Sequence, residues 1–193
     1  MMNIFRWLKP RKPVDRLRHW VKRQHKGQRI KKSGKPYFTH LLAVAEIAAP
    51  VTYLGYEIGL CHDLLEDTSI TANGLLAALI NFNYKPDQAS YIVSAVVELT
   101  DVYTGDAYPN LDRITRKEME ARRLCSISPA AQTVKYCDLM DNIKWVLQYD
   151  GRHAVEYLKK KEALVDCMNS GDPELRQKVI EMIRHELERL KSS

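Results

Sequence analysis

Apolar residues recur at helical spacing through almost the whole chain, and this pattern limits the possible folds more than any other feature. Val14, Leu17 and Val21 are one example, with Trp20 beside them. No alternating run of β-branched residues, no hairpin signal and no internal repeat interrupts the pattern. The sequence therefore predicts an all-α fold, in a single domain of about nine helices.

Glycine, proline and N-capping residues divide this pattern into segments. Gly27 and Pro50 each end one segment, and Ser128 before Pro129 is typical of a helix start. The stretch 102–110 contains Gly, Pro and several polar residues, so we expect a loop there. The expected helices cover 14–26, 37–49, 56–67, 72–82, 86–101, 111–124, 129–150, 153–168 and 173–191.

Composition places the chain among ordinary globular proteins. Its 193 residues, 45% of them hydrophobic, are enough for one domain with a sizeable core. No apolar run has the length of a membrane span, and residues 1–13 do not resemble a secretory signal. The four cysteines are far apart in apolar segments and form no CxxC pair, which indicates buried, reduced thiols. Reduced thiols in turn favour a cytoplasmic location.

The charge is distributed unevenly. Residues 1–35 contain 13 Lys and Arg but only one acid, Asp15, whereas the whole chain has a net charge of +6. We expect a basic N-terminal arm, residues 1–13, before a single helical domain at 14–193. Such an arm could bind nucleic acid, contact phosphates in the chain's own active site, or aid solubility. No aromatic interleaving or nucleic-acid-binding motif accompanies it, which disfavours nucleic acid as the partner.

Residues 60–68 carry the densest group of chemically useful side chains. Projected as one helix, they place an imidazole and three carboxylates within an arc of about 140°, opposite an apolar face. The polar residues are His62, Asp63, Glu66 and Asp67. Carboxylates this close repel one another unless a cation or proton intervenes. The adjacent His and Asp offer two ligands to a divalent ion, although a solvated acidic helix face is the alternative explanation.

Two further residues could complete a metal site. His40 lies near the start of the expected helix 37–49, and Asp138 lies within 129–150. Taken singly, His40 could be a core histidine and Asp138 a salt-bridge partner of Lys135. Together with His62 and Asp63 they form a mixed nitrogen and oxygen set, which suits Mn²⁺ or Fe²⁺ better than a thiolate zinc site.

Three motifs resemble those of the RelA/SpoT-homologue hydrolase domains, within the HD-domain metal-dependent phosphohydrolases. Gly27-Gln28 and the segment 32–40 resemble the signature GQ…KSGEPYxxH, and 62–68 matches HDxxEDT. The segment 135–142 is similar to KLADRLxN. The similarity extends over about residues 14–165, and no synthetase domain follows, so the chain looks like a stand-alone small alarmone hydrolase.

The resemblance implies a specific role for each matched residue. It implies that His40, His62, Asp63 and Asp138 bind one Mn²⁺, and that Glu66 and Asp67 orient and deprotonate the attacking water. The implied substrate-binding residues are Lys31, Lys32, Ser33, Arg113, Lys117 and Asn142. The implied reaction removes the 3′-pyrophosphate from the stringent-response alarmones ppGpp and pppGpp, giving GDP or GTP.

Two departures from the family pattern concern the nucleotide base. Lys31 stands where the family usually has Arg, and Trp145 replaces a small polar residue. Lysine cannot stack or fork as arginine does, so the choice between guanine and adenine alarmones stays open. The alternatives are therefore a hydrolase of adenosine alarmones or another HD-type nucleotide phosphohydrolase. A non-catalytic nucleic-acid-binding module that uses the basic arm is a second alternative.

Overall fold

The structure is a computed structural model that describes residues 12–192, and within these residues all regular elements are helices. Between residues 12 and 192, the β-type pairing is one isolated antiparallel bridge between Arg29 and Pro36. The all-α prediction is therefore confirmed. The helices are α1 (Pro13–Gln24), α2 (Phe38–Ala48), α3 (Gly55–Cys61), α4 (Leu64–Asp67), α5 (Ala72–Asn81), α6 (Pro86–Leu99), α7 (Arg113–Leu124), α8 (Pro129–Tyr149), α9 (Gly151–Cys167) and α10 (Pro173–Lys191).

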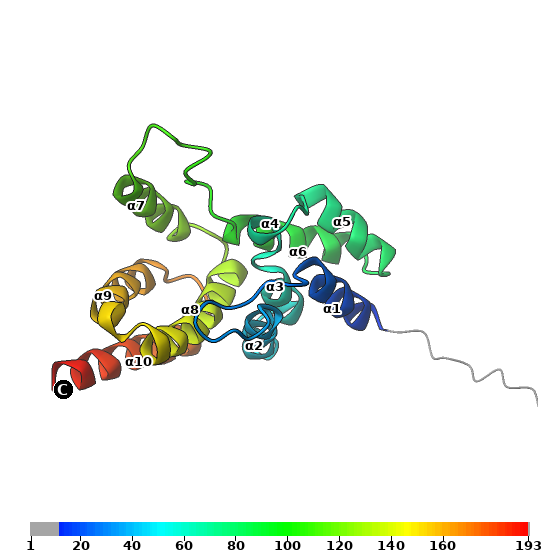
Figure 1. Cartoon of the computed structure of the whole chain (residues 1–193). Helices are drawn as coiled ribbons and strands as arrows, with labels where there is room; N and C mark the ends of the chain where they lie inside the picture. Colours follow the sequence, from blue (N-terminus) through cyan, green and yellow to red (C-terminus); the bar gives the residue numbers. More distant parts are fainter. Residues whose placement is uncertain (1–11, 193) are drawn as a thin grey trace, which may run out of the picture.

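Helix α8 is the centre of the fold. It packs against α2, α3 and α6 on one side and against α9 and α10 on the other (Figure 1). A helix enclosed in this way must be apolar around much of its circumference, and Tyr136, Leu139 and Ile143 of α8 are almost fully buried. Ser128 caps its start by accepting a hydrogen bond from the amide of Ala131. Residues on α8 are therefore well placed to build a rigid site.

The expected helix 56–67 is wrong in one respect, because α3 ends at Cys61 and α4 starts at Leu64. The Nδ1 atom of His62 donates to the carbonyl oxygen of Gly59 at 2.7 Å, so the side chain occupies an acceptor that the helical backbone would use. A Cβ atom on Gly59 would lie 2.8 Å from Cα of Ala45. Glycine thus allows α3 to approach α2 closely, with the break at His62 and Asp63 facing the interior.

Helix α7 lies away from the bundle, and the stretch before it is the predicted loop (Figure 1). Polar contacts hold both in place. The buried Glu120 carboxylate accepts from the amides of Val102 and Tyr103, at 2.9 and 3.0 Å. Arg123 donates to the carbonyl oxygens of Glu98 and Thr100. These hydrogen bonds attach α7 to the end of α6.

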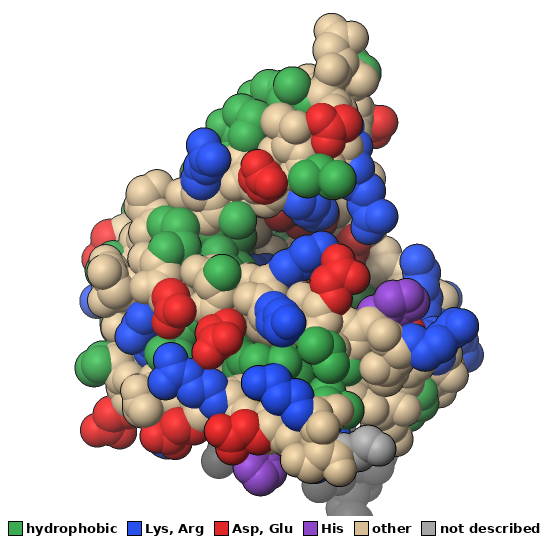
Figure 2. Space-filling view, turned by 90° about the vertical axis from the view of Figure 1, so that its left-hand side faces the viewer, with side chains coloured by type: hydrophobic (Ala, Val, Ile, Leu, Met, Phe, Trp, Pro, Cys, Tyr) green, Lys and Arg blue, Asp and Glu red, His purple; other side chains and the backbone are tan. Residues whose placement is uncertain are grey.

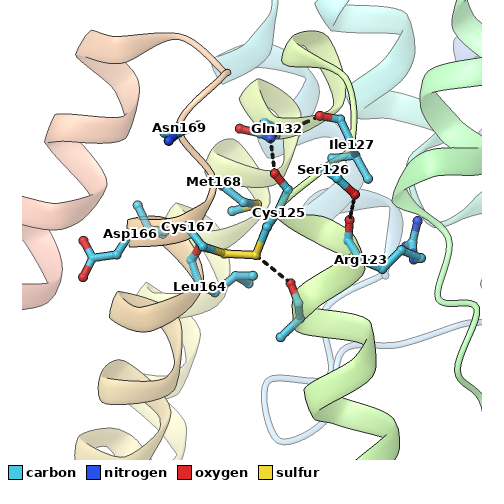
Figure 3. Close-up of a disulfide and its surroundings, with 12 residues drawn as sticks. Arg123, Cys125, Ser126, Ile127, Gln132, Leu164, Asp166, Cys167, Met168 and Asn169 are labelled. Carbon is cyan, nitrogen blue, oxygen red and sulfur yellow. Dashed lines mark hydrogen bonds between the residues drawn. A yellow bond between two sulfur atoms is a disulfide. The ribbon is translucent and has the colours of Figure 1, made fainter.

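The prediction of four reduced cysteines is wrong for two of them, because Cys125 and Cys167 form a disulfide (Figure 3). Their separation of 42 residues hides the pairing, which arises when the end of α9 packs beside the α7–α8 turn. Cys61 and Cys137 are buried free thiols, as expected. Because Cys125 and Cys167 are paired, the four cysteines do not establish the expected cytoplasmic location.

Two further predictions concern the basic N-terminal arm and the lack of a membrane span. The expected basic arm lies largely outside the described residues, which begin at Lys12. Among the helices that the structure does describe, none is both long and apolar enough to cross a membrane.

Candidate active site

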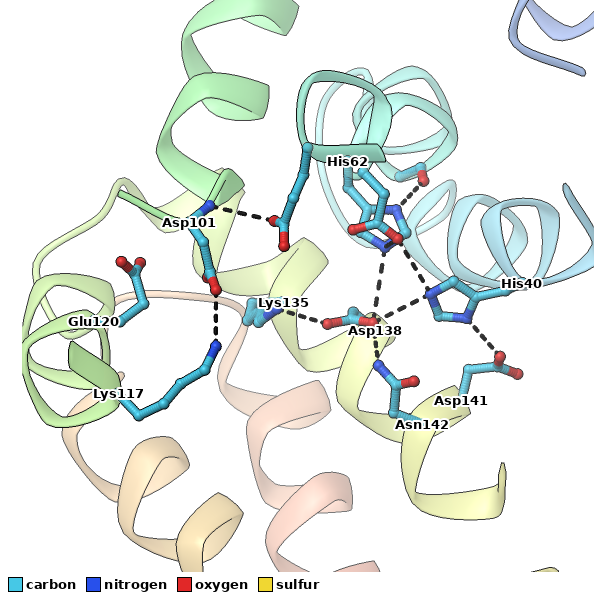
Figure 4. Close-up of polar contacts among 12 residues, drawn as sticks. His40, His62, Asp101, Lys117, Glu120, Lys135, Asp138, Asp141 and Asn142 are labelled. Carbon is cyan, nitrogen blue, oxygen red and sulfur yellow. Dashed lines mark hydrogen bonds and ion pairs between the residues drawn. The ribbon is translucent and has the colours of Figure 1, made fainter. Parts of the chain in front are cut away.

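The four side chains expected to bind metal lie close together: His40, His62 and Asp138 point toward one another (Figure 4), and Asp63 lies beside the two imidazoles. His40 extends from α2, Asp138 from α8, and His62 and Asp63 from the break between α3 and α4. The Nε2 atom of His40 lies 3.3 Å from Oδ1 of Asp138 and 3.7 Å from Oδ2 of Asp63. For His62 the Nε2 distances to the same two oxygens are 3.7 and 3.1 Å. His40, His62 and Asp63 therefore offer ligand atoms that all lie within 4.8 Å of one another, and Oδ1 of Asp138 approaches both imidazoles.

Both imidazoles are oriented by hydrogen bonds on their outer nitrogens. His62 donates from Nδ1 to the Gly59 carbonyl, and Nδ1 of His40 lies 2.7 Å from Oδ2 of Asp141. Since a carboxylate and a carbonyl accept, each Nδ1 carries a proton, and each Nε2 faces the cluster, where it would offer its lone pair to a bound metal. Within the described part of the chain, Nε2 of His62 is buried and lacks a hydrogen-bond partner. This arrangement is typical of metal-binding histidines.

The electrostatics of the cluster also fit a cation. Burial by itself lowers the pKa of both imidazoles, but the neighbouring carboxylates outweigh it and raise the pKa of His40 to about 9 and of His62 to about 10. Burial opposes ionisation of Asp63, yet the charge of His62 lowers its pKa to about 2. The cluster thus holds more negative charge than neutral imidazoles can balance, which a divalent ion would correct.

The Asp138 carboxylate is shared among several partners. Its Oδ2 pairs with Nζ of Lys135 at 2.8 Å, and Nδ2 of Asn142 donates to its Oδ1 at 2.5 Å. Although burial opposes ionisation, Lys135 holds the pKa of Asp138 well below its usual range. The alternative explanation of Asp138 as a partner of Lys135 is therefore correct for one oxygen, while the other oxygen faces the histidines.

Glu66 and Asp67 extend from α4 beside this cluster. The Oε2 atom of Glu66 accepts from the amide of Asp101 at 3.3 Å. Partial burial raises the pKa of Glu66, and the charge of Asp101 adds to the shift. Partial burial likewise raises the pKa of Asp67, with Asp63 as the second cause. A raised carboxylate pKa lies nearer neutrality, which suits a group that takes a proton from water.

A pocket of about 530 Å³ opens over the cluster. The molecule is hollowed beneath the lobe that α7 and its loop form, with charged side chains gathered at the hollow (Figure 2). Arg29, Lys31 and Trp145 line one part of the pocket. Residues of α7 and α9 line another part, among them Lys117 and Lys161. A pocket that combines cations with an aromatic ring suits a phosphorylated nucleotide.

The structure brings only some of the expected substrate-binding residues to this pocket. Lys31, Lys117 and Asn142 line it. Lys32 instead donates to the carbonyl oxygen of Tyr149 and to Oδ1 of Asp150, both at 2.8 Å. Ser33 and Arg113 are also outside the pocket lining. Ser33 belongs to the turn after Lys32, and Arg113 is exposed at the first residue of α7.

Several pocket residues were not predicted from the sequence. Asp141 lies three residues after Asp138 on the same helix, a spacing that could have identified it. Tyr37 donates its hydroxyl to Oδ2 of Asp63 at 2.6 Å, and it precedes His40 in the first motif. Asp101 and Lys161 lie outside the motifs, so packing alone reveals their positions.

Comparisons with known proteins agree with this fold. No family model matches the chain. A Streptomyces coelicolor protein named GTP pyrophosphokinase is 30% identical over 154 residues, which cover 77% of this chain and 15% of the relative. A Mycobacterium leprae protein named probable GTP pyrophosphokinase is 30% identical over 126 residues, covering 63% and 14%. The chain therefore spans only about a seventh of the length of these curated relatives.

A solved structure is similar over nearly its whole length. It is described as a metazoan orthologue of SpoT that hydrolyses ppGpp and plays a role in starvation responses. The TM-score is 0.73 at 22% sequence identity, and the match covers 92% of this chain and 97% of the other. This likeness confirms the predicted helical HD-domain fold. The two sequence relatives and the solved structure also agree with the resemblance to RelA/SpoT homologues.

Proposed function

We propose that this chain is a metal-dependent hydrolase that removes the 3′-pyrophosphate from ppGpp and pppGpp, giving GDP or GTP. The observation that carries the proposal is the convergence of two imidazoles and two carboxylates beside Glu66 and Asp67 in a lysine-lined pocket. The fold shared with a ppGpp hydrolase and the sequence similarity to enzymes named GTP pyrophosphokinase support this choice of substrate class.

The proposed metal ligands are His40, His62, Asp63 and Asp138, and the proposed ion is Mn²⁺. Two nitrogens and two carboxylate oxygens suit such an ion, with open positions left for water and substrate. When bound, the ion would acidify a water molecule and offset negative charge on the phosphate. Asp141 and the Gly59 carbonyl would hold the two imidazoles in the orientation that binding requires.

Glu66 is the proposed general base, with Asp67 next to it. Glu66 takes one proton from the attacking water, and the water oxygen forms a bond to the 3′-α phosphorus. The bond between that phosphorus and the ribose O3′ breaks, and O3′ leaves with a proton from solvent or from Glu66. Lys117 and Lys135 offset the negative charge of the pyrophosphoryl group that is transferred to water. Glu66, Asp67, Lys117 and Lys135 all line the same pocket.

The nucleotide base is proposed to bind near Lys31 and Trp145. The indole Nε1 of Trp145 donates to the carbonyl oxygen of Lys31 at 3.2 Å, which fixes the ring at the pocket. Stacking on an indole favours any purine because every base has an aromatic face. Since Lys31 lacks the fork of arginine, adenosine alarmones remain a second candidate substrate class.

The test uses the whole chain stripped of metal and then supplied with Mn²⁺. ppGpp and pppApp are assayed side by side, and products are separated by ion-exchange chromatography. We expect Mn²⁺-dependent release of pyrophosphate by the wild type and loss of both turnover and metal in His62→Ala. His19→Ala, at an exposed position on α1, is the matched control and should retain activity. Full metal occupancy in His62→Ala would contradict the proposed ligand set.

A further inference from the structure

Lys161 differs from Lys117 and Lys135, which line the same pocket. It extends from α9, lines the pocket, and its Nζ lies 5.3 Å from the centre of the Tyr157 ring. Lys117 pairs with Asp101 at 2.9 Å and Lys135 with Asp138 at 2.8 Å. Lys161 forms no such ion pair with any residue between 12 and 192. Its charge is therefore available for an anion that enters the pocket.

The surroundings of Lys161 make an unpaired ammonium group costly. Burial lowers the pKa of Lys161 to about 8, and the charge of Lys135 adds to the effect. A partly buried cation is stabilised by an opposite charge at hydrogen-bond distance. A purely structural explanation is also available, because a lysine stem can cover apolar groups such as Leu164. The two explanations differ in whether the positive charge matters.

The contacts around Lys117 indicate which part of the substrate would reach the part of the pocket that Lys117 and Lys161 line. The amide of Asp101 donates to Glu66, and the carboxylate of Asp101 binds Lys117 (Figure 4). Lys117 is thus connected to the proposed base through Asp101. Trp145, the proposed base-binding ring, extends from the C-terminal half of α8, whereas Lys135 and Asp138 lie further towards its start. A substrate with its 3′-α phosphorus near Glu66 would direct the next phosphoryl group towards the lysines.

We propose that Lys161, together with Lys117, forms a subsite for the outer phosphoryl group of the substrate's 3′-diphosphate. This inference rests on the proposed function and extends it to substrate selection. Lys117 is partly neutralised by Asp101, so Lys161 supplies the charge that a second phosphoryl group requires. The subsite would make the enzyme prefer a nucleoside 5′-diphosphate that carries a 3′-diphosphate over the same nucleotide with a 3′-monophosphate.

The kinetic test compares ppGpp with guanosine 5′-diphosphate 3′-monophosphate. Lys161→Met keeps the stem and removes the charge, so we expect kcat/KM for ppGpp to fall about 10- to 100-fold, with little change for the monophosphate. Lys161→Arg should retain most of the preference. Lys159→Met, at an exposed position on the same helix, is the matched control. An equal loss on both substrates, or no loss on ppGpp, would overturn the subsite.

A binding measurement separates this inference from the proposed function. Pyrophosphate is titrated into the metal-stripped whole chain, and binding is measured by calorimetry. We expect Lys161→Met to weaken pyrophosphate binding at least about fivefold, and Lys159→Met to leave it unchanged. If the wild type hydrolyses no ppGpp but this difference is found, the subsite stands and the proposed function fails. If ppGpp is hydrolysed but Lys161→Met binds pyrophosphate like the wild type, the subsite is wrong.

Discussion

At the scale of single residues, Glu66 and Asp67 are adjacent carboxylates with different partners. Glu66 accepts from the Asp101 amide, whereas Asp67 lies closer to Tyr37 and Asp63. Glu66→Gln keeps the shape and hydrogen-bonding capacity but cannot take a proton. We expect it to lower kcat about 10²- to 10⁴-fold, with Mn²⁺ content and KM nearly unchanged, as measured by steady-state assays and metal analysis.

Asp67→Asn provides the comparison within the pair. A larger loss of kcat in Asp67→Asn than in Glu66→Gln would reverse the two roles. Less than a tenfold loss in both variants would mean that the carboxylates are a solvated acidic face, and the mechanism would then be wrong.

Asp141 is expected to act through His40 and not on the substrate. Its carboxylate accepts the Nδ1 proton of His40, which leaves Nε2 free to bind metal. Removing such a partner typically weakens metal binding by about 10- to 100-fold. We therefore expect Asp141→Ala to raise the Kd for Mn²⁺ by that factor, as measured by chelator competition. Asp166→Ala, at an exposed position on α9, is the control, and equal affinities in both variants would exclude this role.

The pKa of Lys161 predicts an alkaline limb in the pH profile. The charged groups around it are Lys117, Lys135, Asp101 and Asp138. Because its pKa is lowered to about 8, the ammonium is present below that pH and is lost as the pH rises through it. Binding of phosphate needs the charged form, so kcat/KM for ppGpp should fall above about pH 8.

Lys161→Arg tests the origin of this limb, since a guanidinium group stays charged across the whole range. The fall in kcat/KM should move to higher pH in this variant. An unchanged limb would assign the titration to another group.

At the scale of elements, the disulfide holds α7 against the rest of the molecule. Cys125 follows the last residue of α7, and Cys167 is the last residue of α9. Because α7 lies away from the bundle, we expect Cys125→Ser/Cys167→Ser to lower the free energy of unfolding by about 2–4 kcal/mol. Urea unfolding followed by circular dichroism measures this.

Reductant supplies the control for that prediction. It should destabilise the wild type by a similar amount and leave the double variant unchanged. Cys61 and Cys137 should contribute nothing to the effect, because burial raises the pKa of both thiols. Equal stability of the reduced and oxidised wild type would contradict a stabilising disulfide.

The elements also show where sequence periodicity succeeds and fails. The segment 129–150 was predicted almost to the residue, because Ser128 and Pro129 define its start and apolar residues fill it. The break at His62 was missed, because the residues on both sides are helical and only a side-chain bond to Gly59 interrupts the backbone. Hydrophobic spacing carries no information about such a bond.

At the scale of the whole molecule, the sequence predicts those residues of the candidate site that lie within the three short motifs. His40, His62 and Asp138 come from three separate segments, and their likeness to one family pattern is enough to group them in one site. Lys161 lies in a run of three lysines, which by itself indicates a solvated surface. Its place in the pocket depends on how α9 packs against α8, and sequence spacing does not determine that packing.

The cysteines illustrate the same limit over a longer distance. Cys125 directly follows α7 and Cys167 is the last residue of α9, so ordinary helical residues precede both. Their pairing depends on the position of α9 relative to the α7–α8 turn. Local context correctly indicated buried thiols for Cys61 and Cys137, whose surroundings are core helices. Long-range packing decided the other two.

In the proposed reaction, water attacks the 3′-α phosphorus of the alarmone in this pocket. Hydrolysis of ppGpp by the Mn²⁺-loaded chain in H₂¹⁸O, followed by mass spectrometry of both products, tests this step. We expect unlabelled GDP and pyrophosphate that carries one ¹⁸O atom. Release of labelled orthophosphate with a 3′-monophosphate nucleotide, or no hydrolysis at all, would contradict it.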